Sequence, residues 1–417
     1  MIKYGILAFD RDIRPELLCA GLSLLERGIR TMARAGIKHL LVVVPKDATV
    51  KLNKITHHLD IQLEIVTWGT ESLQVFQENQ DVLLLLGDHV HHHTSLSQLA
   101  NKGLQGADMV VQTSNAPNQN LPLYSVALDK TVDFQSSVEK IDCPVATGAF
   151  LCSSRIAASE LTTKLTVEDS GDKNRFREAT DFLSFRTTGM QVLSTNSNLD
   201  LLWRRVIDRK SSRQAKSMLF SHVTKSTSGP VSRHINARLS IPTSKLLIET
   251  GISPHLVTVL FVMPTGLMGA YLISRPDNYL CFALAGLFWQ LAAVFDRCDG
   301  EVARVQLSES KFGAWFDTLT DNFAYLCAYV GFLLGINRLY GYDSTYMYLA
   351  FSAVGAMLIT LILMYTYAIK TGSGSLQNYF VGFSRHVPAQ EKGFLYRIFE
   401  RYGFLAKRDF FSFIFLL

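Results

Sequence analysis

Four stretches in the second half of this 417-residue chain contain no Asp, Glu, Lys or Arg, and they constrain its fold more than any other feature. They are residues 252–273, 279–295, 322–337 and 344–369. A helix needs about 20 apolar residues to cross the hydrocarbon core of a bilayer. Residues 1–250 instead mix polar and apolar side chains, as a globular domain does. The sequence therefore predicts a soluble N-terminal domain fused to an all-α polytopic membrane domain with four full transmembrane helices.

The last eight residues, 410–417 (FFSFIFLL), are apolar but too few to span a bilayer as a helix. We interpret them as a fifth span that is cut short, with an interfacial tail as the alternative. The predicted organisation is a soluble domain over residues 1–215, a basic juxtamembrane helix over 216–250 and a membrane domain over 251–417.

The distribution of Lys and Arg predicts which side of the membrane each segment faces. Residues 201–245 contain ten Lys or Arg and one acid, and residues 370–408 contain seven and two. By the positive-inside rule, these segments, the 296–311 connection and the N-terminal domain face the cytoplasm, in a multi-pass protein of the cell membrane. Basic residues beside a membrane helix attract anionic headgroups, so membrane lipids are the expected partner of residues 201–245 and nucleic acid is not.

In the soluble domain, short apolar runs predict buried strands, and residues 21–36 have the periodicity of an amphipathic helix. The predicted strands are residues 4–9, 39–44, 62–66 and 82–86. Strands and a helix in this alternation are typical of a parallel, Rossmann-like α/β sheet. Asp88 follows the last of these strands directly, at the carboxyl end where such sheets bind ligands.

This arrangement resembles the nucleotidyltransferases, in which an aspartate at the place of Asp88 binds a metal ion; Thr147–Phe150 (TGAF) resembles a further strand of that family. The first loop, FDRDIRPELLCAG, departs from the family because it lacks the glycine-rich phosphate-binding pattern. The family usually has its second metal-binding aspartate in a segment with two aspartates, and Arg205 and Ile207 stand at the two matching places here. Asp208 could only be a shifted substitute for that aspartate. The prediction is a degenerate, structural domain; an active cytidylyltransferase is the alternative.

A histidine cluster follows Asp88 in the segment HVHHHT: His89, His91, His92 and His93. A transition-metal site would require these side chains to converge in space. The prediction is a solvated loop.

Eight polar or small residues at fixed spacing lie between the second and third apolar stretches. They are Asp296, Asp299, Gly300, Ala303, Arg304, Gly313, Asp317 and Asp321. Intramembrane carboxylates are energetically expensive and usually functional. Four of them on two adjacent helices would repel one another unless cations neutralise them. Their hard oxygen ligands suit Mg²⁺ or Mn²⁺, and two such ions could clamp the oxygens of a phosphoryl displacement.

This motif resembles the signature of the CDP-alcohol phosphotransferase (CDP-alcohol phosphatidyltransferase) family, whose fold has six spans. The resemblance implies that Asp296, Asp299, Asp317 and Asp321 bind two metal ions and that Asp321 is also the catalytic general base. It further implies a CDP-binding pocket shaped by Asp299 and by the small and basic positions of the motif, Gly300, Ala303, Arg304 and Gly313. The donor would be a CDP-alcohol, and the acceptor a hydroxyl of a lipid or of a polyol phosphate.

Lys311 and Arg385 are candidate contacts for an acceptor phosphate, although membrane topology explains them equally well. Residues 229–258 precede the first span and predict an interfacial amphipathic helix followed by a helix cap at Ser253 and Pro254. His255 stands where the family has an asparagine.

The fused arrangement of the two domains resembles the bifunctional inositol-phosphate cytidylyltransferase/di-inositol-phosphate phosphate synthases, and family members form homodimers. A bifunctional enzyme and a non-catalytic membrane scaffold remain the alternatives.

Overall fold

The computed structural model describes residues 2–9, 13–45, 47–48, 59–67, 80–104, 106, 109–114, 123–126, 132–135, 145–153, 190–194, 203–224, 229–275, 278–341 and 344–371. The chain divides into two compact units, Met1–Ser221 and His222–Leu417. The first unit ends in helix α6 (Arg209–Ser221).

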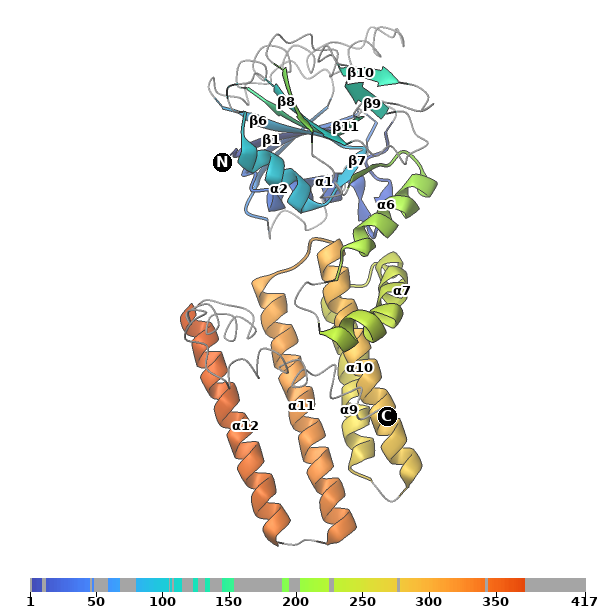
Figure 1. Cartoon of the computed structure of the whole chain (residues 1–417), viewed down its shortest axis with the longest axis vertical. Coiled ribbons are helices and arrows are strands. Elements are labelled where there is room, and N and C mark those ends of the chain that lie inside the picture. The colour runs from blue at the N-terminus through green and yellow to red at the C-terminus, as the bar shows by residue number, and fades with distance from the viewer. Residues whose placement is uncertain are drawn as a thin grey trace. The chain divides into compact units, whose positions relative to one another are not determined.

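A mixed sheet forms the first unit (Figure 1). Its parallel part consists of β1 (Tyr4–Ala8), β4 (His39–Val44), β5 (Gln62–Thr67) and β6 (Val82–Leu86), in the order β6-β1-β4-β5. These are the four strands predicted from the sequence. Because both faces of β1, β4 and β6 are covered, their residues are almost all buried, as continuous apolar runs in parallel strands require.

The other half of the sheet contains an antiparallel neighbour of β6. This strand is β11 (Val145–Cys152), which includes the predicted TGAF segment. Further sheet strands in the described residues are β8 (Met109–Ser114), β9 (Leu123–Val126), β10 (Val132–Gln135) and β12 (Met190–Ser194). Two small ladders add β2 (Leu18–Cys19) with β3 (Leu22–Ser23), and β7 (His89–His91) with β13 (Trp203–Arg205).

Helix α1 (Leu24–Arg34) is the predicted helix of the soluble domain, and α2 (His93–Lys102) follows β7. Ser23 caps α1: its Oγ accepts a hydrogen bond from the backbone N–H of Glu26 at 3.1 Å. Such a cap satisfies one of the free N–H groups of the first turn, and so the helix begins at Leu24 rather than at residue 21.

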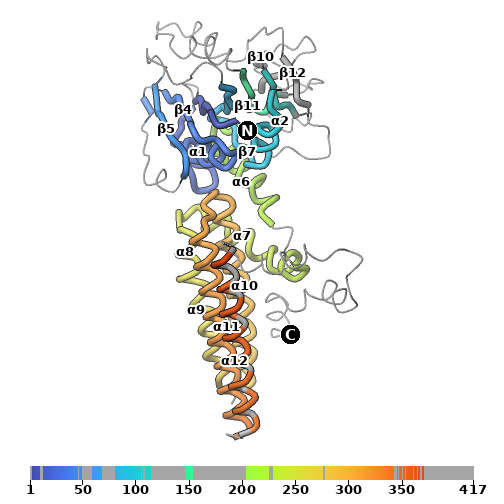
Figure 2. The backbone as a smooth tube through the Cα atoms, turned by 90° about the vertical axis from the view of Figure 1, so that its left-hand side faces the viewer, coloured from blue at the N-terminus to red at the C-terminus, as the bar shows by residue number. Residues whose placement is uncertain are grey.

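The second unit is helical. Its elements in chain order are η3 (Ser232–Asn236), α7 (Ala237–Leu247), η4 (Ile248–Thr250), α8 (Pro254–Val257), η5 (Thr258–Val262), α9 (Met263–Ile273), α10 (Tyr279–Val305), α11 (Lys311–Tyr340) and α12 (Ser344–Thr371). Helix α9 packs against α10 and α11, and α12 contacts α11. In both Figure 1 and Figure 2 these helices run along a common direction.

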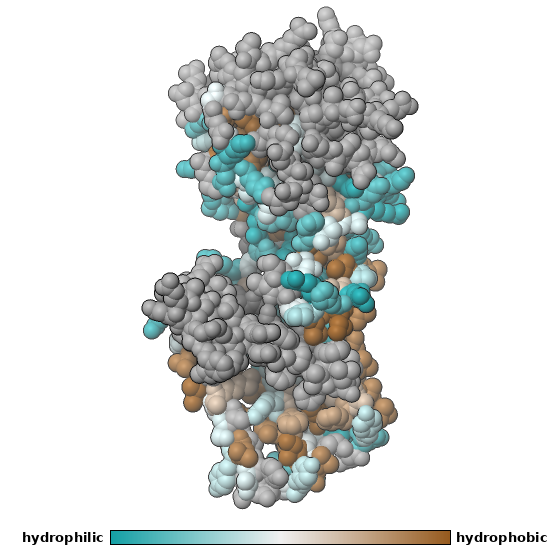
Figure 3. All heavy atoms as spheres, in the orientation of Figure 1, coloured by the Kyte–Doolittle hydropathy of each residue, from teal (hydrophilic) through white to brown (hydrophobic). Residues whose placement is uncertain are grey.

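Three helices of the described residues are long and apolar enough to cross a membrane: Pro254–Ile273, Tyr279–Val305 and Lys311–Tyr340. Helix α12 contains a shorter apolar segment, Met347–Leu363. Large apolar side chains are exposed along these helices, and Figure 3 shows hydrophobic residues gathered on their surface. A count of four full spans remains a prediction, and the proposed truncated span at 410–417 lies outside the described residues.

The connection after the second span is shorter than predicted. Helix α10 continues to Val305 and α11 begins at Lys311, so residues 306–310, rather than 296–311, connect them. Leu307 ends α10 in the left-handed region, at φ 52°, and the N–H of Ser308 bonds to the carbonyl of Ala303 at 2.9 Å. This is the hydrogen bond of a Schellman-type helix end, and it leaves the first half of the motif entirely helical.

Two glycines bring α11 against α9. A Cβ on Gly331 would lie 2.2 Å from the carbonyl oxygen of Ala270, and one on Gly335 would lie 2.5 Å from that of Ile273. Small residues at four-residue spacing allow such close helix approach in membranes. The backbone of α9 cannot retreat as a flexible side chain could.

We therefore expect Gly331→Ala to destabilise the helical unit by about 1–3 kcal/mol, the cost of overpacking a close contact. Unfolding of the full-length protein in detergent, followed by circular dichroism against denaturant, measures the change. Gly355→Ala is the matched control, because a Cβ at this α12 position has open space around it. Equal stability of the two variants would contradict the expectation.

Candidate active site

Three carboxylates of the sequence motif converge in the helical unit. One oxygen each of Asp296 and Asp299 on α10 and of Asp317 on α11 lie within 4.8 Å of one another. Asp296 and Asp299 are three residues apart and so share a face of α10. Asp321 is one turn further along α11 and lies outside this group of three. The structure thus brings together three of the four predicted ligands.

Asp299 also forms a hydrogen bond with a residue outside the motif. Its Oδ2 accepts a hydrogen bond of 2.6 Å from Oγ1 of Thr258, the first residue of η5, and both side chains are buried. The predicted cap at Ser253 is also confirmed, since Ser253 Oγ accepts from the N–H of Leu256 at 3.3 Å. The sequence interpretation gave Thr258 no role, although this threonine is the last residue of an entry to the first span, Ser253–Thr258, that resembles the entry in the family.

The first residues of α11 lie beside His255. A Cβ on Gly313 would lie 3.1 Å from Cε1 of His255, so this histidine stands beside the glycine of α11. Phe312 and Phe316 present their rings edge-on to His255, at centroid distances of 5.8 and 5.6 Å. Lys311 is exposed at the first residue of α11.

Arg304 lies over Gly300. A Cβ on Gly300 would come within 3.1 Å of the Arg304 Nη1. The Nε of Arg304 donates to the carbonyl of Val223 at 2.9 Å, which leaves the outer edge of the guanidinium beside the glycine. Ala303 is the other small residue of the motif and is half-buried. Arg385, the second predicted acceptor contact, lies outside the described residues.

The donor set fits divalent metal ions. Three carboxylates supply only hard oxygen ligands, which Mg²⁺ and Mn²⁺ prefer. Their mutual repulsion at this distance also favours a bound cation.

Asp88 of the first unit lies in a different environment. Its Oδ2 accepts a 2.5 Å hydrogen bond from Nε of Arg205, and its Oδ1 accepts one of 2.7 Å from Nδ1 of His89. Burial alone would raise the pKa of the Asp88 carboxyl, but His89 and Arg205 outweigh burial and hold it well below its usual range. The carboxylate is therefore already neutralised by residues of the chain itself.

Two of the four clustered histidines are not in a solvated loop, contrary to the sequence prediction, whereas His92 and His93 are half-buried at the start of α2. His89 and His91 are 3% and 2% exposed because they form β7 against Trp203 of β13. The Nε2 of His91 donates to the carbonyl of Thr147 at 2.7 Å, and burial lowers the pKa of His91 to about 3. Alternating strand residues point to the same face, so both rings lie inside.

Asp208 has a structural role at the start of α6. Its Oδ1 accepts hydrogen bonds from the backbone N–H of Ser211 at 2.7 Å and from the Ser211 hydroxyl at 2.6 Å. These contacts are those of a helix cap.

Comparison with known proteins identifies the helical unit. Residues 252–389 match the CDP-alcohol phosphatidyltransferase family. Within the C-terminal region, these residues carry a CDP-alcohol phosphatidyltransferase domain. This match, together with the long apolar helices, makes the chain a membrane protein.

The alignment with one relative extends beyond this domain. A bifunctional IPC transferase and DIPP synthase of Rubrobacter xylanophilus is 27% identical over 83% of this chain and 78% of the relative. Its counterpart in Thermococcus kodakarensis is 37% identical, over 29% of this chain and 27% of the relative. The solved inositol-1-phosphate CTP transferase of T. maritima covers 52% of this chain and 96% of its own length, with 11% identity and a TM-score of 0.37.

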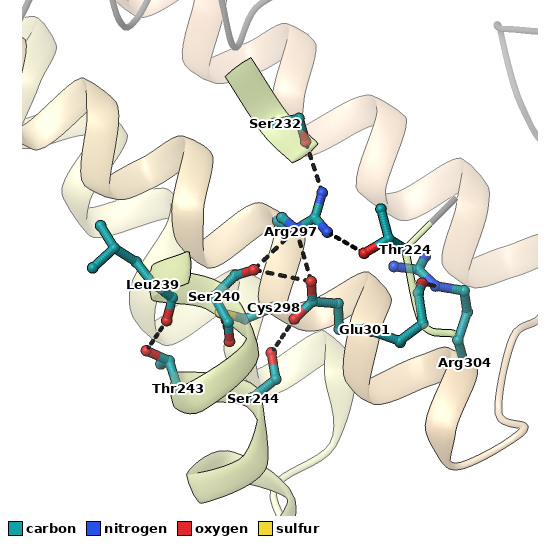
Figure 4. A network of polar contacts seen from close by, with 11 residues as sticks. Thr224, Ser232, Leu239, Ser240, Thr243, Ser244, Arg297, Cys298, Glu301 and Arg304 are labelled. Atoms are coloured by element: carbon teal, nitrogen blue, oxygen red, sulfur yellow. Dashed lines mark hydrogen bonds and ion pairs between the residues drawn. The ribbon is translucent and has the colours of Figure 1, made fainter. Parts of the chain in front are cut away.

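The phosphatidyltransferase domain contains a second polar cluster on α10, which the sequence interpretation missed. Arg297 and Glu301 occupy unspecified positions of the motif, and Glu301 is fully buried. Figure 4 shows both side chains among hydroxyl groups of η3 and α7. A charged pair four residues apart inside an intramembrane motif was the signal that could have revealed it.

Proposed function

We propose that this protein is a membrane phosphotransferase that moves a substituted phosphate group from a CDP-alcohol to an acceptor hydroxyl and releases CMP. Its place is the synthesis of phospholipids or related phosphodiesters. The observation that carries the proposal is the convergence of Asp296, Asp299 and Asp317 within 4.8 Å, inside the family match.

In the proposed reaction, Asp321 takes the proton of the acceptor hydroxyl. The hydroxyl oxygen forms a bond to the β-phosphorus of the CDP-alcohol, and the bond from that phosphorus to the CMP oxygen breaks. CMP leaves with the electron pair. Mg²⁺ or Mn²⁺ ions held by Asp296, Asp299 and Asp317, with a share from Asp321, would neutralise the charge on the phosphate oxygens.

The remaining motif residues would bind the donor. Arg304 offers a guanidinium to the diphosphate. Gly300, Ala303 and Gly313 leave room for the nucleotide because they carry small side chains or none. Lys311 and Arg385 would contact an acceptor that carries a phosphate, such as a lipid or polyol phosphate.

We place the active site and the N-terminal unit on the cytoplasmic side of the cell membrane, because of the basic residues that flank the spans. Membrane lipids surround the helices in this arrangement, and a homodimer is the proposed assembly.

The first unit is proposed to be catalytically inert. The pairing of Asp88 with Arg205 and His89 supports this, because a carboxylate neutralised within the chain has little to offer a metal ion. The second candidate function is a bifunctional enzyme whose first unit also makes the CDP-alcohol, of the CDP-inositol type, from CTP. The alignment with the bifunctional relative of Rubrobacter xylanophilus favours it.

One assay tests the proposed activity. Purified full-length protein in lipid vesicles receives Mg²⁺, an acceptor and one of several CDP-alcohols, among them CDP-inositol, CDP-glycerol and CDP-diacylglycerol. CMP release with at least one donor is expected. No release from any donor, with Mg²⁺ or Mn²⁺, would overturn the proposal.

A second assay separates the two candidates. Full-length Asp317→Asn protein, in which the membrane reaction is disabled, receives CTP with inositol phosphate or sugar phosphates. No pyrophosphate release is expected from an inert first unit, whereas release would establish the bifunctional enzyme.

A further inference from the structure

A stripe of polar side chains runs along α10 on the side away from the metal-binding carboxylates. It consists of Gln290, Arg297 and Glu301, at spacings of seven and four residues that return to one helix face. At 3.6 residues per turn, Glu301 is about 140° around the helix from Asp296, and Arg297 about 160° from Asp299. The two sets of side chains therefore point in different directions from one helix.

A matching stripe lies on η3 and α7. Ser232, Asn236, Ser240 and Ser244 recur every four residues, and all four are buried. Leu239 and Leu246 of α7 are instead exposed, at 54% and 65%. This helix therefore directs its polar side at α10 and its apolar side outward, which is the arrangement of a helix surrounded by lipid.

Hydrogen bonds join the two stripes into a seam, which we name the α7–α10 seam (Figure 4). Both carboxylate oxygens of Glu301 accept from serines, Oε1 from Ser240 at 2.9 Å and Oε2 from Ser244 at 2.8 Å. The Nε of Arg297 donates to Glu301 at 2.7 Å and to Ser240 at 2.9 Å.

The seam has further links at both ends. The two remaining nitrogens of Arg297 donate to Ser232 at 2.9 Å and to Thr224 at 2.8 Å. Two turns before Arg297 on α10, the Nε2 of Gln290 donates a hydrogen bond to Oδ1 of Asn236 at 2.6 Å. The charged groups of the seam are thus fully engaged by hydrogen bonds that come from η3, α7 and the segment before them.

We propose that the α7–α10 seam is a positioning device for the metal site, with Arg297 and Glu301 as its positioning residues. A helix is rigid about its own axis, so fixing Arg297 and Glu301 against α7 also fixes the direction in which Asp296 and Asp299 point. Thr258 holds Asp299 from the other side, which leaves α10 one rotational setting. The proposal rests on the proposed function in that it concerns the same carboxylates.

The chemistry of the seam favours positioning over simple stabilisation. A buried ion pair contributes little net stability compared with apolar residues of the same volume, but it requires one geometry. A functional site must be held within about 0.5 Å of its productive geometry by groups that are themselves locked. A seam of directional hydrogen bonds meets that requirement, whereas apolar packing tolerates rotation more easily.

The test measures metal affinity, with Mn²⁺ as the probe, by electron paramagnetic resonance on the full-length protein in detergent. We expect Glu301→Gln, Ser240→Ala and the double variant Ser240→Ala/Ser244→Ala to raise the Kd for Mn²⁺ about 10–100-fold, as loss of supporting groups does at other metal sites. Thr243→Ala is the matched control on α7, because the Thr243 hydroxyl bonds only to the Leu239 carbonyl among the contacts drawn. Its Kd should equal that of the unchanged protein.

Unfolding without metal is measured in parallel. Serine variants that lose stability but bind Mn²⁺ as Thr243→Ala does would overturn the proposal and leave the seam a packing feature. If Glu301→Gln does not fold, the serine variants decide. If the unchanged protein binds Mn²⁺ but releases CMP from no donor, the proposed function fails while the affinity comparison still tests the seam. Unchanged protein that does not bind Mn²⁺ would overturn both.

Discussion

Asp317→Asn is expected to lower CMP release by at least about 100-fold. The substitution replaces one of the three clustered carboxylates with a neutral amide of the same shape. Metal ions stabilise transition-state charge by several kcal/mol, and each 1.4 kcal/mol corresponds to a factor of ten in rate. The Kd for Mn²⁺ should rise in the same variant. The measurement is CMP release by the vesicle assay, with Mn²⁺ binding followed separately.

Two comparisons sharpen this prediction. Asp321→Asn should also lose CMP release but keep more of its Mn²⁺ affinity than Asp317→Asn, since Asp321 lies outside the group of three. Glu309→Gln removes an exposed carboxylate from the 306–310 connection and should leave the Kd for Mn²⁺ unchanged, since Glu309 lies outside the group of three. CMP release abolished by either aspartate substitution would eliminate the non-catalytic scaffold, which predicts that both variants keep the cellular role of the protein. CMP release retained in both variants would contradict the prediction.

Arg205→Met is expected to destabilise the first unit by about 3–5 kcal/mol, the cost of leaving a buried charge without its partner. Asp88 would retain only His89 of the two side chains that neutralise it. Urea unfolding of the full-length protein, followed by limited proteolysis of the first unit, measures the change.

Arg204→Met is the matched control for this substitution. Arg204 is the preceding residue of β13, and its exposed Nη1 donates to Gln214 at 3.5 Å. The loss should be within about 0.5 kcal/mol, as for other surface substitutions. Equal stability of the two variants would contradict a structural role for the Asp88–Arg205 pair.

The same pair predicts a pH dependence. The pKa of Asp88 is lower in the folded protein than in the unfolded chain. Its contribution to stability is therefore complete above the unfolded pKa of about 3.9 and is lost as the pH falls towards the folded pKa. The difference in free energy of unfolding between the unchanged protein and Arg205→Met should accordingly shrink below about pH 4.

Local patterns predicted much of this protein. The strands at β1, β4, β5 and β6 were predicted within one residue of their observed ends, because buried parallel strands are uninterrupted apolar runs. Helical spacing predicted that Asp296 and Asp299 share one face of α10, and the family resemblance implied that Asp317 joins them as a metal ligand. The structure brings the three carboxylates together, and their binding of metal ions stays a prediction. Charge-free stretches likewise predicted the three apolar helices that are long enough to cross a membrane.

Other features depended on contacts between segments far apart in the chain. His89 and His91 look like a polar loop in the sequence, and only pairing with β13, more than 100 residues away, buries them. Asp88 looked like the remnant of a metal site, and only the same pairing brings Arg205 to it. Sequence spacing carries no information about such partners.

The sequence by itself determined which helices are apolar and which face of α10 carries the carboxylates, since both follow from residue type and helical period. Only the tertiary structure decided that Thr258 bonds to Asp299 and that Ser240 and Ser244 bond to Glu301 of α10. Hydroxyl groups are common in helices, and they become supports only where folding buries them against a charge that must be satisfied.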